Sequence, residues 1–260
     1  MALALSTDTP CVRDRVSPEE WQTRVDLAAC YRLVAHFGWI DLIYNHISAR
    51  VPGPEEHFLL NPYGFMFEEV TASSLVKIDL DGNVVMDTPF EVNAAGFTIH
   101  SAVHMARPDV ACVIHTHTHA GMAVSAQEDG LLPLTQNALM FHGDRLAYHD
   151  YEGIAFDLTE RERLIADLGD RFAMILRNHG LLACGRTIPE AFEILQNLEH
   201  ACAAQIAAQA GGGPLITPSE AVCRHTADQF WSSTGDRGYG VRAWPAMLRL
   251  MNRHNPGYDV

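Results

Sequence analysis

Hydrophobic positions repeat along the chain in two ways, one with the period of an amphipathic helix and one in the short apolar runs typical of strands. The first helix begins after Ser17, a capping residue followed by Pro18 and by Glu20, which is expected to complete a capping box, and its apolar stripe continues to about Phe37. Four more helices are expected, at about 96–106, 120–126, 159–168 and 189–209. Strands are expected at 46–50, 57–60, 76–78, 111–114, 173–176 and 181–184. Strands and helices that share one core predict an α/β or α+β layered fold.

The clearest break in this pattern is the Gly-Gly-Gly-Pro run at 211–214. We therefore expect an N-terminal tail at 1–16, a main domain at 17–210 and a C-terminal helical appendage at 211–260 that packs back or reaches a neighbouring subunit. No apolar run reaches the roughly 20 residues that a bilayer span needs, and the N-terminus lacks a signal-peptide pattern. The six cysteines form no C-x-x-C pair, so a reducing, cytoplasmic location is expected.

Charge narrows the classes of partner. The chain has 18 Lys and Arg against 32 Asp and Glu, a formal net charge of -14, which argues against nucleic acid or an anionic membrane as the main partner. Its one lysine, Lys77, leaves a single candidate for Schiff-base chemistry. Its 14 histidines favour a metal instead.

The sharpest chemical feature is a pair of histidines at the end of a predicted buried strand. His115 and His117 alternate on an extended backbone, so both side chains can lie on one side. His179 follows another apolar strand in the same context. Three histidine ligands with an open position are typical of a catalytic metal.

Other histidines carry weaker signals. His100 and His104 are four residues apart on a predicted helix, which suits a metal site but more often reflects hydrogen-bonded structural residues. His119 continues the alternation of His115 and His117 and is a candidate acid or base.

At family level, the chain resembles the class II aldolase/adducin family over roughly residues 18–210. The matching segments are Asn45–Arg50, Asn61–Gly64, Ala106–Asp109, His115–His117 and Asn178–Leu182, with Ala95–Ala102, Ala147–Tyr151 and Arg177–Leu181 closest to the adducin-like branch. The resemblance implies a three-layer α/β/α fold around a mainly antiparallel sheet. It also implies homotetramers with sites at subunit interfaces. Zn²⁺ is the metal expected on His115, His117 and His179, with Mn²⁺ or Fe²⁺ as alternatives.

Two departures from the family pattern change the expected substrate. Sugar-phosphate aldolases of the family carry Ser-Ser-Glu where this chain has Ala94, Ala95 and Gly96, and an asparagine of their phosphate loop is His46 here. The serines hold phosphate and the glutamate is the acid/base, so a sugar-phosphate aldolase is not expected. Losing general acid/base catalysis costs about 10²–10⁴-fold in rate.

We therefore expect a divalent-metal-dependent lyase that cleaves a C–C bond, by decarboxylation or retro-aldol chemistry, in a non-phosphorylated hydroxy-, keto- or aromatic acid. His119 or His46 is expected to supply the proton, and Arg50 or Arg177 can hold a carboxylate. The expected substrate-binding residues are Ser48, Arg50, Asn61 and Gly64.

Two alternatives stay open. One is a non-catalytic oligomerisation module like the adducin head, which also lacks the glutamate; this chain has no lysine-rich tail for membrane or protein contact. The other is an Fe(II)-dependent oxygenase that uses the same three histidines.

Overall fold

The computed structural model describes residues 9–153, 159–232 and 238–260, apart from the side chains of Ala94 and Ala95. Its centre is a seven-stranded sheet with the strand order β3-β2-β1-β4-β7-β6-β5. Every neighbouring pair is antiparallel except β5 and β6. The strands are β1 (His46–Arg50), β2 (Phe58–Leu60), β3 (Val76–Ile78), β4 (Cys112–Thr116), β5 (Ala147–His149), β6 (Ala173–Leu176) and β7 (Gly180–Gly185).

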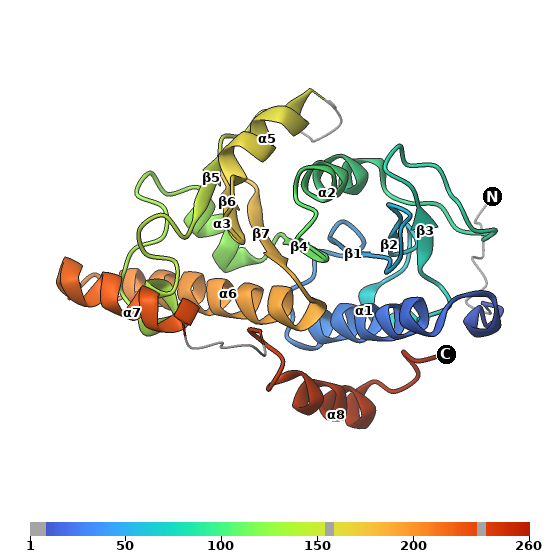
Figure 1. Cartoon of the computed structure of the whole chain (residues 1–260). Coiled ribbons are helices and arrows are strands. Elements are labelled where there is room, and N and C mark those ends of the chain that lie inside the picture. Colours follow the sequence, from blue (N-terminus) through green and yellow to red (C-terminus); the bar gives the residue numbers. More distant parts are fainter. Residues whose placement is uncertain (1–8, 154–158, 233–237) are drawn as a thin grey trace.

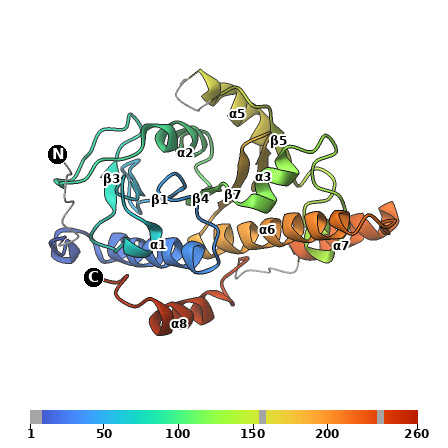
Figure 2. The ribbon, with the colours of Figure 1, turned by 180° about the vertical axis from the view of Figure 1, so that it is seen from behind.

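Helices cover both faces of this sheet. The α-helices are α1 (Pro18–His36), α2 (Ala94–Ala106), α3 (His119–Ser125), α4 (Gln136–Leu139), α5 (Glu160–Leu168), α6 (Ile188–Ala210), α7 (Glu220–Ser232) and α8 (Trp244–His254). Short 3-10 helices lie at Arg13–Arg15 and Phe67–Glu69. The long helices α1 and α6 run along one face, and α2 and α5 lie on the other (Figures 1 and 2). The expected three-layer α/β/α fold with a mainly antiparallel sheet is thus confirmed.

The centre of the sheet places the histidines. In the antiparallel register of β1 and β4, His46 lies opposite His115, and His115 lies opposite Leu182 of β7. His115 is fully buried. His46 and His115, which belong to strands far apart in the sequence, are therefore direct neighbours on the sheet.

The start of α1 differs in detail from the sequence pattern. The Ser17 hydroxyl accepts the Glu20 backbone N–H at 3.1 Å, as a cap should. The Glu20 carboxylate does not complete a capping box, because it pairs with Arg24 and with Lys77, each at 2.9 Å. The only lysine of the chain is thus part of a largely buried ion-pair network.

The residues after Gly211–Pro214 return to the main domain. Trp244 of α8 donates to Asp26 of α1 at 2.8 Å. The backbone N–H of Ala72 donates to the Tyr258 carbonyl at 2.8 Å. The exact domain boundaries stay a prediction. In the described part of the chain, no helix combines the length and apolar character needed to cross a membrane.

Candidate metal centre

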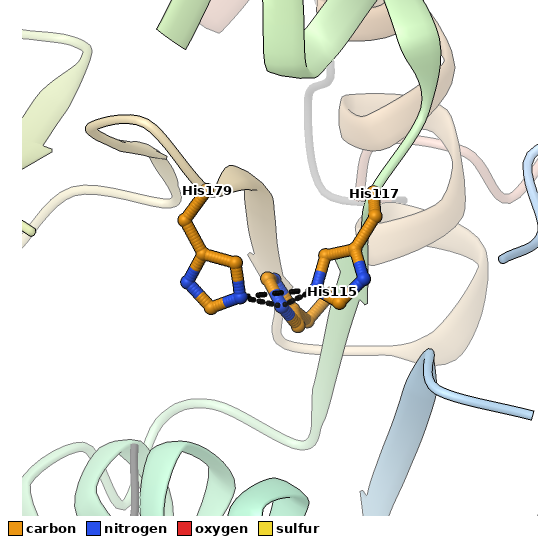
Figure 3. A group of neighbouring side chains, drawn as sticks. All are labelled: His115, His117 and His179. Carbon is orange, nitrogen blue, oxygen red and sulfur yellow. Dashed lines mark hydrogen bonds between the residues drawn. The ribbon is translucent and has the colours of Figure 1, made fainter. Parts of the chain in front are cut away.

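Three histidine side chains meet at the ends of β4 and β6 (Figure 3). The Nε2 atom of His115 lies 2.8 Å from that of His117 and 3.2 Å from that of His179, and the last two are 3.0 Å apart. These residues form the one group in the described chain whose ligand atoms lie close enough to hold a metal ion. The structure therefore brings together the three residues that the sequence proposes as ligands.

Local backbone geometry explains how His179 reaches the other two histidines. It lies in the tight turn between β6 and β7, where Asn178 takes a left-handed conformation with φ 55°. Asparagine tolerates this conformation better than most residues. A Cβ at Gly180 would lie 2.3 Å from the Thr116 carbonyl oxygen, so only glycine lets the turn approach β4 so closely.

Hydrogen bonds at the other ring nitrogen orient two of the imidazoles. His115 Nδ1 lies 2.9 Å from the Leu181 carbonyl, and His117 Nδ1 lies 3.1 Å from a carboxylate oxygen of Asp41. Because both partners only accept, each Nδ1 carries the proton and each Nε2 presents a lone pair.

This donor set fits a divalent metal. Lone pairs on neighbouring imidazoles repel each other at about 3 Å, and a shared cation removes the repulsion. Nitrogens bound tetrahedrally at about 2.0–2.1 Å from zinc are ~3.3 Å apart, close to the observed spacing. Burial, together with the neighbouring histidines, lowers the pKa of His115 well below its usual value and that of His179 to about 4. Both rings are therefore neutral, as ligands must be.

The Asp41 carboxylate gives a direct test of this arrangement. We expect Asp41→Asn to weaken zinc binding by about 10–100-fold, because an amide oxygen is a poorer acceptor for the His117 Nδ1–H. Calorimetric titration of metal-free protein with Zn²⁺ measures the change. Asp14, which lies far along the chain in the 3-10 helix Arg13–Arg15, provides the control variant Asp14→Asn. Equal affinities of the two variants would contradict the role of Asp41.

His46 occupies the space beside Gly96. A Cβ added at Gly96 would lie 2.7 Å from Cδ2 and 3.2 Å from Nε2 of His46. The ring centroids of His46 and His115 are 5.1 Å apart. The imidazole of His46 thus fills the volume into which a side chain at position 96 would project, next to the three histidines.

This close fit predicts strong coupling between the two positions. Gly96→Ala should destabilise the protein by about 1–3 kcal/mol, because the new methyl group collides with the His46 ring. In a His46→Ala background the collision is absent, and alanine gains up to about 1 kcal/mol over glycine in a helix. Urea unfolding of the four proteins of this cycle measures the coupling. Additive effects would show that the two residues do not touch.

The His46 ring continues into a buried chain of hydrogen bonds. His46 Nδ1 lies 2.8 Å from His100 Nε2, His100 Nδ1 lies 2.6 Å from the Ser48 hydroxyl, and this hydroxyl lies 2.7 Å from His104 Nε2. His100, Ser48 and His104 are fully buried. The sequence-based preference for a hydrogen-bonded role of His100 and His104 agrees with these contacts, and neither residue joins the three-histidine group.

Acid should destabilise the fold through this chain. Burial lowers the pKa of His100 well below its usual value and that of His104 to about 3. The folded state therefore binds fewer protons than the unfolded state, and stability is lost as the pH falls from about 6.5 toward 3. Each imidazole contributes up to about 1.4 kcal/mol per pH unit. Urea unfolding at pH 7, 6 and 5 should show a shallower decline for His104→Phe than for the wild type; an equal decline would contradict this account.

The remaining candidate residues lie around this centre without contacting it. In the described residues, no side-chain hydrogen bond or ion pair joins His119, Arg50 or Asn61 to the three histidines. His119 is exposed at the first turn of α3, and Gly64 lies in an exposed turn with φ 98°. The guanidinium of Arg50 donates to the His104 carbonyl. Substrate contacts by Ser48, Arg50, Asn61 and Gly64 stay predictions.

Two residues that contact candidate site residues carry no recognisable sequence signal. Asp41 lies in an irregular loop after α1, and nothing in its neighbourhood marks it as a partner of His117. Tyr31 is fully buried on α1, and its hydroxyl oxygen accepts the backbone N–H groups of Ile47 and Asn61 at 3.0 Å each. The same hydroxyl lies 2.9 Å from the Asn61 side-chain oxygen, so Asn61 is held in place by Tyr31.

Comparison with known proteins identifies the family. The model of the Class II Aldolase and Adducin N-terminal domain matches residues 25–206. The crystal structure of an aldolase II superfamily protein from Pseudomonas syringae is 54% identical, with a TM-score of 0.90, and the match covers 96% of this chain and 100% of that one. An L-fuculose 1-phosphate aldolase from Glaciozyma antarctica PI12 is 29% identical, with a TM-score of 0.79 and 99% of each chain covered.

Alpha-adducin of Mus musculus is 51% identical over 248 residues, which are 90% of this chain but 33% of alpha-adducin. The chain thus spans about a third of that relative. With a family match over 25–206, the chain belongs to the class II aldolase and adducin family. The resemblance drawn from the sequence motifs is confirmed.

Proposed function

We propose that this protein is a divalent-metal-dependent lyase that cleaves a C–C bond, by decarboxylation or retro-aldol chemistry, in a non-phosphorylated hydroxy-, keto- or aromatic acid. The observation that carries the proposal is the convergence of three Nε2 atoms within 3.2 Å of one another. His115, His117 and His179 would hold a divalent metal, with Zn²⁺ as the first candidate, and the metal would supply Lewis-acid chemistry at a substrate carbonyl.

His46 is the proposed proton donor. Its ring lies beside His115 and fills the volume next to Gly96, where the sequence lacks the glutamate of sugar-phosphate aldolases. When the C–C bond breaks, the electron pair stays on the substrate carbon, which takes the Nε2 proton of His46, and His46 then regains a proton from solvent water. His119, which is exposed at the start of α3, is the second candidate for this role.

The substrate class is proposed from the residues that stand in place of the phosphate-binding serines of sugar-phosphate aldolases. Alanines at 94 and 95 offer no hydroxyl to a phosphate. His115, His117 and His179 would supply three ligands to a bound metal, and a substrate with adjacent oxygen atoms could supply further ones. This arrangement supports an acid that chelates through its own carboxylate and oxo or hydroxyl groups.

A turnover assay tests the proposal. Metal-stripped protein is reloaded with Zn²⁺, Mn²⁺ or, without oxygen, Fe²⁺, and is given a panel of hydroxy-, keto- and aromatic acids beside L-fuculose 1-phosphate. We expect metal-dependent release of CO₂ or an aldehyde from a member of the acid panel. Preferential cleavage of L-fuculose 1-phosphate, absence of turnover with every metal, or oxygen consumption with Fe²⁺ alone would each overturn it.

The identity to alpha-adducin favours a second candidate, a non-catalytic oligomerisation module. Metal-free protein that forms a stable oligomer and shows no turnover after metal loading supports this candidate over the lyase.

We also propose a homotetramer with the sites at subunit interfaces. Next to Asp41, the side chains of Leu42 and Tyr44 are 61% and 48% exposed, which suits a subunit contact beside His117. Light scattering coupled to gel filtration gives the mass: a tetramer is expected for the wild type and smaller species for Leu42→Asp.

A further inference from the structure

Helix α3 begins directly after His117, and it packs against α6 and β7 (Figures 1 and 2). Its N-cap is Thr118, the residue that follows His117 in the sequence. At its other end, the Ser125 carbonyl accepts the backbone N–H of Asn178 at 3.2 Å, and Asn178 directly precedes His179. This helix of seven residues therefore connects the backbone segments that carry two of the three candidate ligands.

The middle of α3 lies against a residue that orients the third ligand. A Cβ at Gly121 would lie 2.7 Å from Cγ of Leu181 and 2.8 Å from the Thr118 hydroxyl oxygen, so only glycine lets the helix pack this closely against β7. The carbonyl of the same Leu181 lies 2.9 Å from His115 Nδ1. The helix thus contacts residues that are next to, or hydrogen-bonded to, all three candidate ligands.

A buried carboxyl group on α6 holds the start of this helix. Thr118 donates its hydroxyl proton to Glu199 at 2.5 Å, and the same hydroxyl accepts the backbone N–H of Gly121 at 3.1 Å. The side chains of Thr118 and Glu199 lie in residues that are each 6% exposed. Because both partners are buried, water does not compete for the hydrogen bond between them.

Glu199 is costly to keep in this place. Within the described residues it forms no ion pair, and burial raises the pKa of its carboxyl group. Burying a carboxyl group without a cation lowers stability unless hydrogen bonds compensate. Thr118 is the one side chain among the described residues that donates to it, so holding Thr118 is the role that its contacts support.

A second polar residue of α6 holds the segment that follows α3. Gln205 donates to the side-chain oxygen of Gln127 at 2.7 Å and to the Gly130 carbonyl at 2.8 Å. The Gln127 carbonyl in turn accepts from the Arg177 guanidinium at 2.6 Å, two residues before His179. Both ends of α3 are therefore fixed on α6.

We propose that Glu199 and Thr118 are positioning residues of the candidate metal centre, and that they fix α3 so that it sets the spacing of His115, His117 and His179 (Figure 3). The inference rests on the proposed function, because it assumes that these histidines hold a metal. Metal ligands have to be held within about 0.5 Å of the productive geometry by the residues that surround them. Here a helix that contacts the supports of all three ligands provides this restraint.

The zinc affinity of two matched variants tests the role of Thr118. Thr118→Val removes the hydroxyl but keeps nearly the same shape, and we expect it to weaken zinc binding by about 10–100-fold, as the loss of groups behind metal ligands does. Thr118→Ser retains the hydroxyl and should bind zinc as the wild type does. Calorimetric titration of the metal-free proteins measures all three affinities. Wild-type affinity in folded Thr118→Val would overturn the proposal.

A control variant removes a capping hydroxyl from another helix. Thr187 caps α6 by accepting the backbone N–H of Glu190 at 3.2 Å, and it follows the end of β7 that is remote from Gly180. Thr187→Val should lower the free energy of unfolding but leave the zinc affinity unchanged. The visible absorption of bound Co²⁺, which reports the arrangement of its ligands, should change in Thr118→Val only. Equal changes in both variants would show general destabilisation and would overturn the positioning role.

The same titration tests Glu199. Glu199→Gln retains an oxygen that accepts from Thr118 and should keep most of the affinity, whereas Glu199→Leu should lose about as much as Thr118→Val. Because both residues act through one hydrogen bond, the double variant should lose no more than either single variant. Additive losses would overturn the shared role. If Thr118→Val does not fold, the comparison of Glu199→Gln with Glu199→Leu decides the proposal.

Hydrogen exchange of the metal-free protein separates this inference from the proposed function. The Asn178 amide donates to Ser125 at the far end of α3, so its exchange should be about 10-fold faster in Thr118→Val, which corresponds to the loss of one capping interaction. Equal exchange in the wild type, Thr118→Val and Thr187→Val would overturn the role of α3. A wild type that binds zinc without turnover overturns only the proposed reaction. A wild type that binds no zinc overturns the metal site, and the exchange rate then decides whether Thr118 fixes the turn that carries His179.

Discussion

His115→Ala is expected to lower the affinity for zinc by at least about 10³-fold. His115 contributes one of three Nε2 atoms, and its own Nδ1 is held by the Leu181 carbonyl 2.9 Å away. Apparent zinc-binding free energies of structural sites are about 10–16 kcal/mol. One ligand of three therefore contributes several kcal/mol, and each 1.4 kcal/mol or so changes the dissociation constant tenfold. Within the described residues, the group that could hold a metal contains no fourth ligand.

Metal content after dialysis and competition with a chelator measure this loss. The matched control is His200→Ala, because His200 is an exposed histidine on α6. The control should keep one zinc per chain, and zinc should also raise its melting temperature, since a ligand that binds only the folded state stabilises it. Stoichiometric, tightly held zinc in His115→Ala would contradict the three-histidine site.

Gly180→Ala is expected to damage both the fold and the candidate metal site through a single methyl group. The added carbon would lie 2.3 Å from the Thr116 carbonyl oxygen and 3.3 Å from Cδ2 of His117. Both neighbours are fixed, one by the β4–β7 pairing and the other by Asp41. The backbone must therefore shift, at a cost of about 3 kcal/mol, and the shift moves His179 away from the other ligands.

The same methyl group can be added where nothing obstructs it. Gly211→Ala provides this control, because its Cβ would meet only the Ala208 carbonyl at 3.5 Å, an ordinary contact. Unfolding in urea should show a large loss for Gly180→Ala and almost none for the control. Calorimetry should show weaker zinc binding only in Gly180→Ala. If Gly180→Ala had the stability and the zinc affinity of the wild type, the close approach of this turn to β4 would be refuted.

Much of the fold could be predicted because it depends on local pattern. The capping serine and apolar stripe of α1, and the apolar strands that precede His115 and His179, are visible as periodicity in the sequence. Strand β5 escaped prediction because its sequence, Ala-Tyr-His, is not an apolar run, and helix α4 escaped it because four residues are too few for a helical period to emerge. The short helices are stabilised by tertiary packing instead.

The candidate site likewise contains some residues that could be predicted from the sequence and others that could not. His115 and His117 could be paired from their spacing, and His179 from its position after a strand. Asp41, Tyr31 and the order of the chain from His46 to His104 could not, because these contacts join segments far apart in sequence. Their partners depend on strand register, which no local pattern encodes for strands of three to five residues.

The contact between His46 and Gly96 also limits how this site can change over evolutionary time. Glutamate at 96 and histidine at 46 compete for one volume, since even a Cβ at 96 lies 2.7 Å from the imidazole. A lineage that exchanges one proton-transfer group for the other must therefore pass through an ancestor in which one of the two positions is already small. The order of the two substitutions is therefore constrained. Histidine at 46 is tolerated only when position 96 is already small, and glutamate at 96 only when position 46 is already small.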